Sequence, residues 1–302
     1  MLDVVIIGSG PAGLTAAIYA KRAGLKVVVV EKDYMGTGQI ANSSRVDNYP
    51  GMPGVDGYTL GENFRSHAES LGVEFIENEI VKIAHENDSW ICTCDDESTI
   101  SASALLYAAG CRHRSLGIES ENAFQGRGVS YCAVCDGAFY KNKDVVVVGG
   151  GDTALDDALY LSEICKKVYL VHRREGFRGS ALTLAKLKEK ANVEIITNAK
   201  VETITGDKKV SGVRLSNGAN LEIDGLFVAV GMIPQTSLLE QFNVLDESGY
   251  IVAGEDGITS CESLFVAGDA RTKNLRQVIT AASDGANAMY SIMHMLSLKA
   301  EI

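Results

Sequence analysis

Two cysteines are the residues of this 302-residue chain best suited to redox chemistry. Cys132 and Cys135 form a C-x-x-C motif, a spacing that can close a small disulfide ring and that favours a lowered thiol pKa. Asp136 follows directly, where a carboxyl group of raised pKa could exchange a proton with a nearby thiol. A solvated turn residue beside Gly137 is the other interpretation of this aspartate. The motif therefore predicts first of all a redox dithiol.

A zinc half-site is the alternative interpretation of this cysteine pair. A structural zinc usually needs four ligands, and the other close pair, Cys92 and Cys94, lies in an alternating sequence that predicts strand residues facing one way. Cys111, Cys165 and Cys261 occupy positions typical of buried packing residues, so we assign them no chemistry. We expect no metal site.

The composition predicts a folded protein with two modest domains. A hydrophobic content of 46% and a charged content of 22% are ordinary, and the length allows two separate cores. The net charge of −11 disfavours nucleic acid or an anionic membrane as the main partner, since both attract clustered Lys and Arg. A strand-like run begins almost at Met1, and no apolar run approaches about 18 residues, so we expect a cytoplasmic protein without a membrane segment.

The pattern of a strand, a glycine-rich turn, a helix and a second strand occurs twice. The first copy has a strand-like run at 4–7, a turn at 8–13 and a second strand-like run that ends at Glu31. The second copy begins with a run at 145–148, and its equivalent of Glu31 is His172. One G-x-G-x-x-G is a weak signal, because glycine also ends helices and makes ordinary turns, but two copies in register predict two dinucleotide sites.

Each glycine of such a turn has its own role. The first permits the turn, the second lets a pyrophosphate approach backbone N–H groups, and the third lets the helix pack against the strand. Ala154, in the third place of the second copy, is an accepted variant. The first site is predicted to comprise Gly8, Gly10, Pro11, Ala12, Gly13 and Glu31, and the second Gly149, Gly151, Asp152 and Thr153.

The residues at the ends of the second strands separate the two ligands. Glu31 can accept hydrogen bonds from a ribose and would repel a 2′-phosphate, which suits FAD or NAD. In the second copy His172, Arg173, Arg174 and Arg178 present cationic donors, which suits the 2′-phosphate of NADPH. A solvated cluster of surface charge is the alternative interpretation of these arginines. Comparable affinities for NADH and NADPH would contradict our prediction.

Over essentially its whole length the chain resembles the low-molecular-weight, bacterial-type thioredoxin reductases, which are class II pyridine nucleotide-disulfide oxidoreductases. The resemblance implies an α/β fold with two Rossmann-like three-layer nucleotide-binding domains, the second inserted in the first. Residues 1–113 and 234–302 would bind FAD, and residues 114–233 would bind NADPH and carry the cysteine pair. The matching segments are 8–13 with Glu31, 48–51, 127–130, 132–137, 149–152, 172–174 with Arg178, 231–234, 268–269 and 276–277.

The resemblance also implies roles for single residues. Cys135 would lie next to the flavin, Cys132 would attack the disulfide of oxidised thioredoxin, and Asp136 would be the acid/base. Hydride would pass from NADPH to FAD and then to the disulfide. The nicotinamide and the dithiol share one domain and must reach the same flavin, so a domain rotation is expected. A homodimer is implied by the resemblance alone. The FAD site would be completed by Gln39, Asn48, Gly110, Gly268, Asp269, Arg276 and Gln277.

Departures from the family pattern leave the partner less certain than the chemistry. Tyr131 and Ala138 differ from the usual residues at positions that would face the partner. Arg127 and Phe139 match positions associated with docking thioredoxin, although a structural role is an equal interpretation. A peroxiredoxin-like protein, a small disulfide or oxygen could be the acceptor instead.

Two further classes can be compared with this interpretation. A non-catalytic flavoprotein redox sensor would not need the predicted 2′-phosphate site. The larger glutathione-reductase type spaces its cysteines by four residues and adds a C-terminal domain with a catalytic histidine, for which this chain is too short. His294 lies in an apolar helical pattern that is typical of a packing or surface residue.

Overall fold

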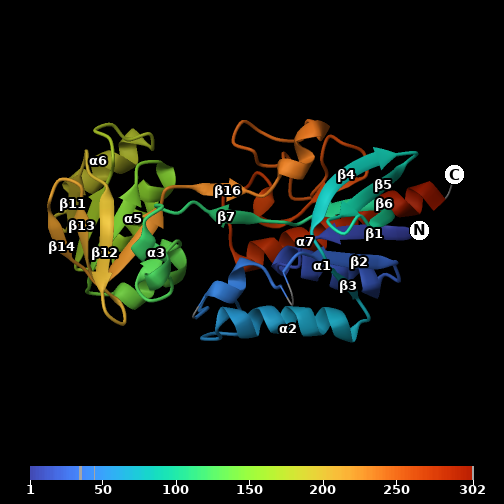
Figure 1. Ribbon diagram of the computed structural model, residues 1–302, viewed down its shortest axis with the longest axis horizontal. Helices are drawn as coiled ribbons and strands as arrows, with labels where there is room; N and C mark the ends of the chain where they lie inside the picture. The colour runs from blue at the N-terminus through green and yellow to red at the C-terminus, as the bar shows by residue number, and fades with distance from the viewer. Residues whose placement is uncertain (34–35, 44, 301–302) are drawn as a thin grey trace. The chain divides into compact units, whose positions relative to one another are not determined.

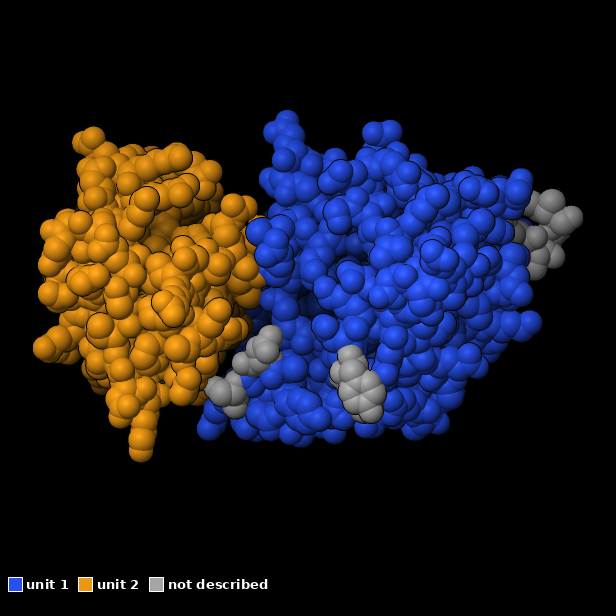
Figure 2. All heavy atoms as spheres, in the orientation of Figure 1, with its two compact units in different colours: residues 1–112, 233–302 blue, residues 113–232 orange. Residues whose placement is uncertain are grey.

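The computed structural model describes residues 1–33, 36–43 and 45–300. The chain forms two compact units, which Figure 2 shows in different colours. Unit 1 comprises Met1–Arg112 and Ile233–Ile302, and unit 2 comprises His113–Met232. Unit 2 is therefore inserted in the sequence of unit 1, and each boundary falls one residue before the predicted one.

Unit 1 is built on a seven-stranded sheet with the order β3-β2-β1-β6-β5-β4, to which β17 is added through β6 (Figure 1). The second half of β6 pairs in parallel with β17, while its first half pairs antiparallel with β5. β17, which comes from the C-terminal segment, thereby joins the parallel strands of the sheet that contains β1. The bounds are β1 (Leu2–Ile7), β2 (Val27–Glu31), β3 (Glu74–Glu77), β4 (Ile80–Glu86), β5 (Ser89–Cys94), β6 (Thr99–Tyr107) and β17 (Leu264–Val266).

Helices and a second cluster of side chains cover the two faces of this sheet. Val4 and Ile6 pack in one cluster with residues of α1 and α7, whereas Val5 and Ile7 pack in another on the opposite face. Burial on both faces explains why residues 4–7 of β1 are continuously apolar. The helices are α1 (Pro11–Arg22), α2 (Gly57–Ser70), α7 (Val278–Ala300) and the short 3₁₀ helices η1 (Gln39–Asn42), η3 (Ser237–Phe242) and η4 (Gly268–Ala270).

Unit 2 contains a five-stranded parallel sheet with the order β11-β10-β9-β15-β8 and a three-stranded antiparallel sheet, β12-β13-β14. Val145 and Val147 of β9 pack with α5, and Val146 and Val148 pack with the antiparallel sheet. The strands are β8 (Val129–Ser130), β9 (Asp144–Gly149), β10 (Lys167–Val171), β11 (Val193–Ile196), β12 (Val201–Gly206), β13 (Val210–Leu215), β14 (Asn220–Glu222) and β15 (Gly225–Ala229). The helices are α3 (Glu119–Phe124), α4 (Ala133–Asp136), η2 (Gly137–Tyr140), α5 (Asp152–Ser162) and α6 (Ala181–Glu189).

The two passages of the chain between the units form a two-stranded ribbon of β7 (Cys111–His113) and β16 (Met232–Pro234). The Arg114 N–H donates to the Gly231 carbonyl at 3.0 Å, and the Gln235 N–H donates to the Gly110 carbonyl at 3.0 Å. Hydrogen bonds therefore flank the ribbon on both sides.

The predicted α/β fold with two nested nucleotide-binding folds is confirmed. Cys92 and Cys94 are buried in β5, as their alternation predicts. Helix α5 ends at Ser162, and Cys165 is buried after it, as expected of a packing residue. Within the residues that the structure describes, no helix combines the length and the apolar character needed to cross a membrane.

Candidate active site

Cys132 and Cys135 form a disulfide at the start of the short helix α4 in unit 2. Their Cα atoms are 5.3 Å apart, and the Sγ atom of Cys132, the N-cap residue, accepts a hydrogen bond from the Cys135 N–H at 3.2 Å. Both cysteines are half-buried. In the part of the chain that is described, no group of three or more His, Cys, Asp or Glu side chains is arranged to hold a metal ion. The arrangement is that of a redox disulfide.

Asp136 and Ser130 form a short polar network beside this disulfide. The Ser130 hydroxyl donates to Asp136 Oδ2 at 2.6 Å and accepts the N–H of Cys132 at 3.1 Å. Burial raises the pKa of Asp136, and the hydrogen bond from Ser130 acts against this rise. Asp136 is thus a half-buried carboxyl group with a specific partner, unlike a solvated turn residue.

The side chain of Tyr131, at a position expected to face the partner, interacts with residues of its own unit. Its hydroxyl donates at 2.8 Å to Glu121, a carboxylate that is only 1% exposed, and its ring stacks on His113 with centroids 5.0 Å apart. Glu121 also accepts the backbone N–H groups of Leu116 and Gly117 at 2.8 and 3.2 Å. The hydroxyl of Tyr131 therefore satisfies a buried carboxylate of its own unit.

Exposed apolar side chains nevertheless lie beside the disulfide. Val134 and Phe139 are 51% and 36% exposed, and Ala138 is also exposed. Arg127 is exposed too, and its guanidinium donates to the carbonyl of Ala123. Val134, Ala138 and Phe139 therefore give the segment around the disulfide an exposed apolar surface.

In the second glycine turn, Gly149 and Gly150 are closely packed, whereas Gly151 has open space at its Cβ position. A Cβ atom on Gly149 would lie 2.3 Å from the Ala229 carbonyl oxygen, and one on Gly150 would lie 2.2 Å from the ring of His172. A Cβ atom on Gly151 would have no described atom within 4 Å. The turn therefore provides the close backbone approach that a pyrophosphate requires, at the start of α5.

His172 lies in a different environment from that expected of a cationic donor, and its place in the nucleotide site stays a prediction. His172 is buried beneath the glycine turn, with its ring 4.8 Å from that of Phe177 and its Nε2 atom 3.2 Å from the carbonyl oxygen of Gly176. Burial lowers the pKa of His172, which favours a neutral ring. This histidine therefore supports the turn by packing.

The three arginines that follow in the same segment differ from His172 in their environment. Arg173, Arg174 and Arg178 are exposed, and their guanidinium groups form no ion pair with the residues that the structure describes. The Arg178 N–H donates to the Gly150 carbonyl at 2.7 Å, so the backbone of this segment is fixed against the glycine turn. The carboxylate of Asp152, at the first position of α5, accepts the N–H of Ser180 at 2.7 Å, and Thr153 is exposed.

The first glycine turn likewise contains one closely packed glycine and one with room at its Cβ position. A Cβ atom on Gly13 would lie 1.9 Å from the Gly8 carbonyl oxygen, whereas one on Gly10 would meet nothing closer than the Gly38 Cα atom at 3.9 Å. Pro11 is the first residue of α1, where its missing N–H costs no hydrogen bond. Glu31, at the end of β2, accepts the Ser9 N–H at 2.9 Å and the Ser9 hydroxyl at 2.8 Å, which directs its carboxylate to the turn.

The C-terminal segment meets this turn within unit 1. Gly268 has φ = +81°, and a Cβ atom there would lie 2.9 Å from the Cβ atom of Ala12. Asp269 follows, and its Oδ1 atom is buried without a hydrogen-bond partner among the described residues. Burial raises the pKa of Asp269, while Lys273 and Arg276 oppose the rise. A buried acceptor without a donor fits a site whose ligand supplies a hydroxyl or an N–H group.

The remaining residues predicted for the flavin come from both segments of unit 1. The amide of Asn48 donates to Gln277 Oε1 at 2.8 Å, and the guanidinium of Arg276 lies over the ring of Tyr250 at 4.2 Å. The amide of Gln39 donates to the carbonyl of Cys111. Gly110 has φ = +67° and open space at its Cβ position. The residues present therefore fit a dinucleotide that spans the first turn and the C-terminal segment.

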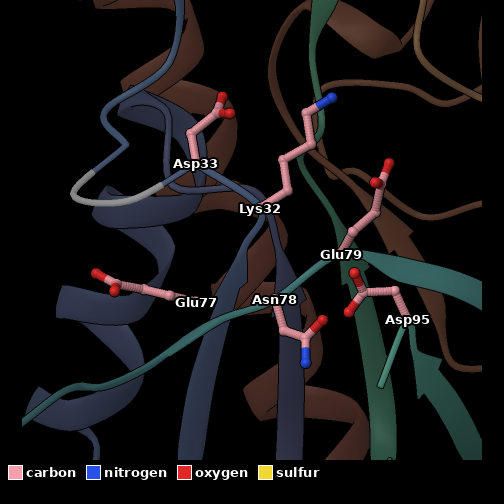
Figure 3. A pocket seen from close by; sticks show the side chains of 6 residues that line it. All are labelled: Lys32, Asp33, Glu77, Asn78, Glu79 and Asp95. Atoms are coloured by element: carbon pink, nitrogen blue, oxygen red, sulfur yellow. The ribbon is translucent and has the colours of Figure 1, made fainter. Parts of the chain in front are cut away.

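A separate pocket of about 440 Å³ lies beyond the end of β2, and Figure 3 shows its lining side chains. Four of them are carboxylates and only one, Lys32, is a cation, so the lining disfavours a phosphate group. The predicted redox residues are not among those that line it. The lining residues are Lys32, Asp33, Glu77, Asn78, Glu79 and Asp95.

Comparison with known proteins identifies what the chain resembles. Residues 2–285 match the family model described as pyridine nucleotide-disulphide oxidoreductase. The thioredoxin reductase of Mycoplasma genitalium is 40% identical over 296 residues, which cover 96% of this chain and 94% of that protein. The thioredoxin reductase of Listeria monocytogenes is 40% identical and covers 94% of this chain and 90% of its own length. The crystal structure of thioredoxin reductase from Streptococcus pyogenes superposes with a TM-score of 0.93 at 37% identity and covers 98% of both chains.

Proposed function

Because the chain belongs to the pyridine nucleotide-disulphide oxidoreductase family, we propose that it is an NADPH-dependent, FAD-containing thioredoxin-disulfide reductase. The observation that carries the proposal is a disulfide beside a half-buried carboxyl group, in the same unit as a glycine turn with three arginines. Such a unit combines a thiol–disulfide exchange site with a site for a phosphorylated nucleotide. A redox sensor without turnover would have no need of that combination.

The nucleotide sites use backbone and charge in different ways. In unit 1, the turn at Gly10 and the carboxylate of Glu31 would hold the pyrophosphate and ribose of FAD, and Asp269 would accept a hydrogen bond from it. In unit 2, the turn at Gly151 would hold the pyrophosphate of NADPH. When bound, NADPH supplies a hydride and FAD passes the two electrons to a disulfide.

Three guanidinium groups account for the proposed choice of NADPH over NADH. Arg173, Arg174 and Arg178 offer planar donors to a 2′-phosphate, and no carboxylate of the described residues neutralises them through an ion pair. Glu31 at the equivalent place in unit 1 would repel such a phosphate. The two turns therefore select different nucleotides with the same backbone geometry.

The dithiol would react with thioredoxin by thiolate exchange. We assign Cys132 as the attacking sulfur, Cys135 as the sulfur next to the flavin and Asp136 as the group that exchanges a proton with the dithiol. The thiolate of Cys132 attacks one sulfur of the substrate disulfide, and the other substrate sulfur leaves as a thiolate. Cys135 then attacks Cys132, which releases the second substrate thiolate and restores the disulfide. The homodimer implied by the family resemblance also remains part of this proposal.

An anaerobic titration followed by flavin absorbance tests the proposed function. We expect NADPH to bleach the flavin at much lower concentration than NADH, and oxidised thioredoxin to restore the colour. Bleaching without recovery by thioredoxin would refute the proposed acceptor and would be followed by assays with a peroxiredoxin-like protein, a small disulfide and oxygen. Failure of NADPH to bleach the flavin would refute the proposed electron donor.

A further inference from the structure

Ser130 hydrogen-bonds to the backbone of Cys132 and to the carboxylate of Asp136, and it was not among the predicted site residues. It is 5% exposed at the end of β8, and its hydroxyl donates to Asp136 Oδ2 at 2.6 Å. The same oxygen accepts the Cys132 N–H at 3.1 Å and lies 3.3 Å from the Cys132 carbonyl oxygen. One buried hydroxyl therefore joins the backbone of the attacking cysteine to the carboxyl group.

We propose that Ser130 is a positioning residue for the dithiol step, whose hydroxyl holds the carboxylate of Asp136 ready to exchange a proton with the Cys132 thiol. This inference rests on the proposed function. In the step, the proton of the Cys132 thiol passes to Asp136, and the resulting thiolate attacks the substrate disulfide. The Cys132–substrate S–S bond forms as the substrate disulfide breaks, and the leaving thiolate takes up the proton held by Asp136. The Cys135 thiol then loses its proton and attacks Cys132, which restores the Cys132–Cys135 bond, and the second substrate thiolate takes up that proton.

The direction of the hydrogen bond determines what Ser130 does to the proton transfer. A hydroxyl that donates to a carboxylate stabilises the charged form, whereas burial of Asp136 favours the neutral form. The two effects oppose each other, and their balance sets the pKa at which the carboxyl group takes up and releases a proton. Without the hydroxyl, burial alone would act, and the pKa of Asp136 would rise further.

The test uses the variant Ser130→Ala and measures a pH profile. A hydrogen bond to a charged group is worth enough to displace the pH limb that depends on Asp136 by about one to two units. We expect this displacement toward higher pH in the reduction of thioredoxin, and recovery of most of it in Ser130→Thr. Ser162→Ala is the matched control, because Ser162 is a buried serine of the same unit that donates to the Leu159 carbonyl.

A combination with Asp136→Asn separates positioning from a general effect on folding. If Ser130 acts through Asp136, Ser130→Ala should cause no further displacement of the pH profile in the Asp136→Asn background. An equal displacement in both backgrounds would overturn the proposal, and so would an unchanged profile in Ser130→Ala. This comparison remains decisive even where the larger side chain introduced by Ser130→Thr does not fit.

A second measurement needs neither cofactor nor thioredoxin. The protein reduced with dithiothreitol is alkylated with iodoacetamide across the pH range, and modification of Cys132 is quantified by mass spectrometry. Ser130→Ala should displace the pH profile of Cys132 alkylation, because the charge of Asp136 affects formation of the Cys132 thiolate. A profile identical to that of the wild type would overturn the proposal. Absence of thioredoxin turnover in the wild type, with an intact alkylation shift, would refute the proposed function alone.

Discussion

At the residue scale, the proposed choice of nucleotide depends on the exposed guanidinium groups that follow β10. Arg173 and Arg174 lie directly after the buried His172, whose packing under Gly150 fixes where they begin. Their positive charge has no ion-pair partner in the described part of the chain, so it remains available to a phosphate. We therefore propose that these arginines bind the 2′-phosphate.

The double variant Arg173→Gln/Arg174→Gln should therefore lose selectivity while it keeps the fold. Charge-assisted hydrogen bonds are worth about 1.5–3 kcal/mol, so the KM for NADPH should rise by about tenfold or more. The KM for NADH should stay nearly constant, and steady-state kinetics with both nucleotides measure the split. Arg214→Gln removes an exposed guanidinium on β13 and serves as the control. An equal change for both nucleotides would show that the arginines do not read the 2′-phosphate.

At the element scale, each strand–turn–helix unit contains glycines of two kinds. One kind is required by close packing within the protein, and we propose that the other is required by the ligand. Gly13 lets α1 approach β1, since a Cβ atom there would lie 1.9 Å from the Gly8 carbonyl oxygen. Gly10 has an ordinary backbone conformation, with φ of −68°, and room in the protein for a methyl group. Its lack of a side chain has no structural cause within the described residues, so we attribute it to the ligand.

This division predicts opposite results for two alanine variants. Gly13→Ala should destabilise unit 1 by about 1–3 kcal/mol or more, because the new methyl group overlaps a backbone carbonyl. Gly10→Ala should leave the thermal stability of the cofactor-free protein unchanged but reduce FAD content, because the methyl group occupies the place of the pyrophosphate. Differential scanning calorimetry and flavin absorbance of the purified variants measure both effects. Full FAD content in Gly10→Ala would contradict the assignment of this turn.

The same elements explain how much could be predicted from the sequence. The glycine turns and the strands around them were predictable, because glycine spacing and continuous apolar runs are local signals. The role of Ser130 was not, because a serine at the end of a two-residue strand looks like any other until α4 folds back to it. The burial of His172 and the pairing of Tyr131 with Glu121 likewise depend on packing between separate elements. Nothing in the sequence around Glu121 indicated that its carboxylate would be only 1% exposed.

At the scale of the whole molecule, two units with separate cores share one chain. Each sheet has its own pair of hydrophobic clusters, and the ribbon of β7 and β16 contains both covalent connections. All residues predicted for FAD belong to unit 1, and all those predicted for NADPH, together with the cysteine pair, belong to unit 2. If the assignment of cofactors is right, each ligand should act on the stability of one unit.

We therefore expect two transitions in the thermal unfolding of the cofactor-free protein. A ligand that binds only the folded state stabilises it by about 2.7 kcal/mol at one hundred times its Kd. FAD should raise the transition of unit 1, and adenosine 2′,5′-bisphosphate, which carries the 2′-phosphate without a nicotinamide, should raise that of unit 2. Calorimetry measures the transitions, and hydrogen exchange at intermediate temperature assigns each to its residues. A single transition raised by both ligands would mean that the units unfold together, and a shift of the wrong unit would reverse the assignment of the two nucleotides.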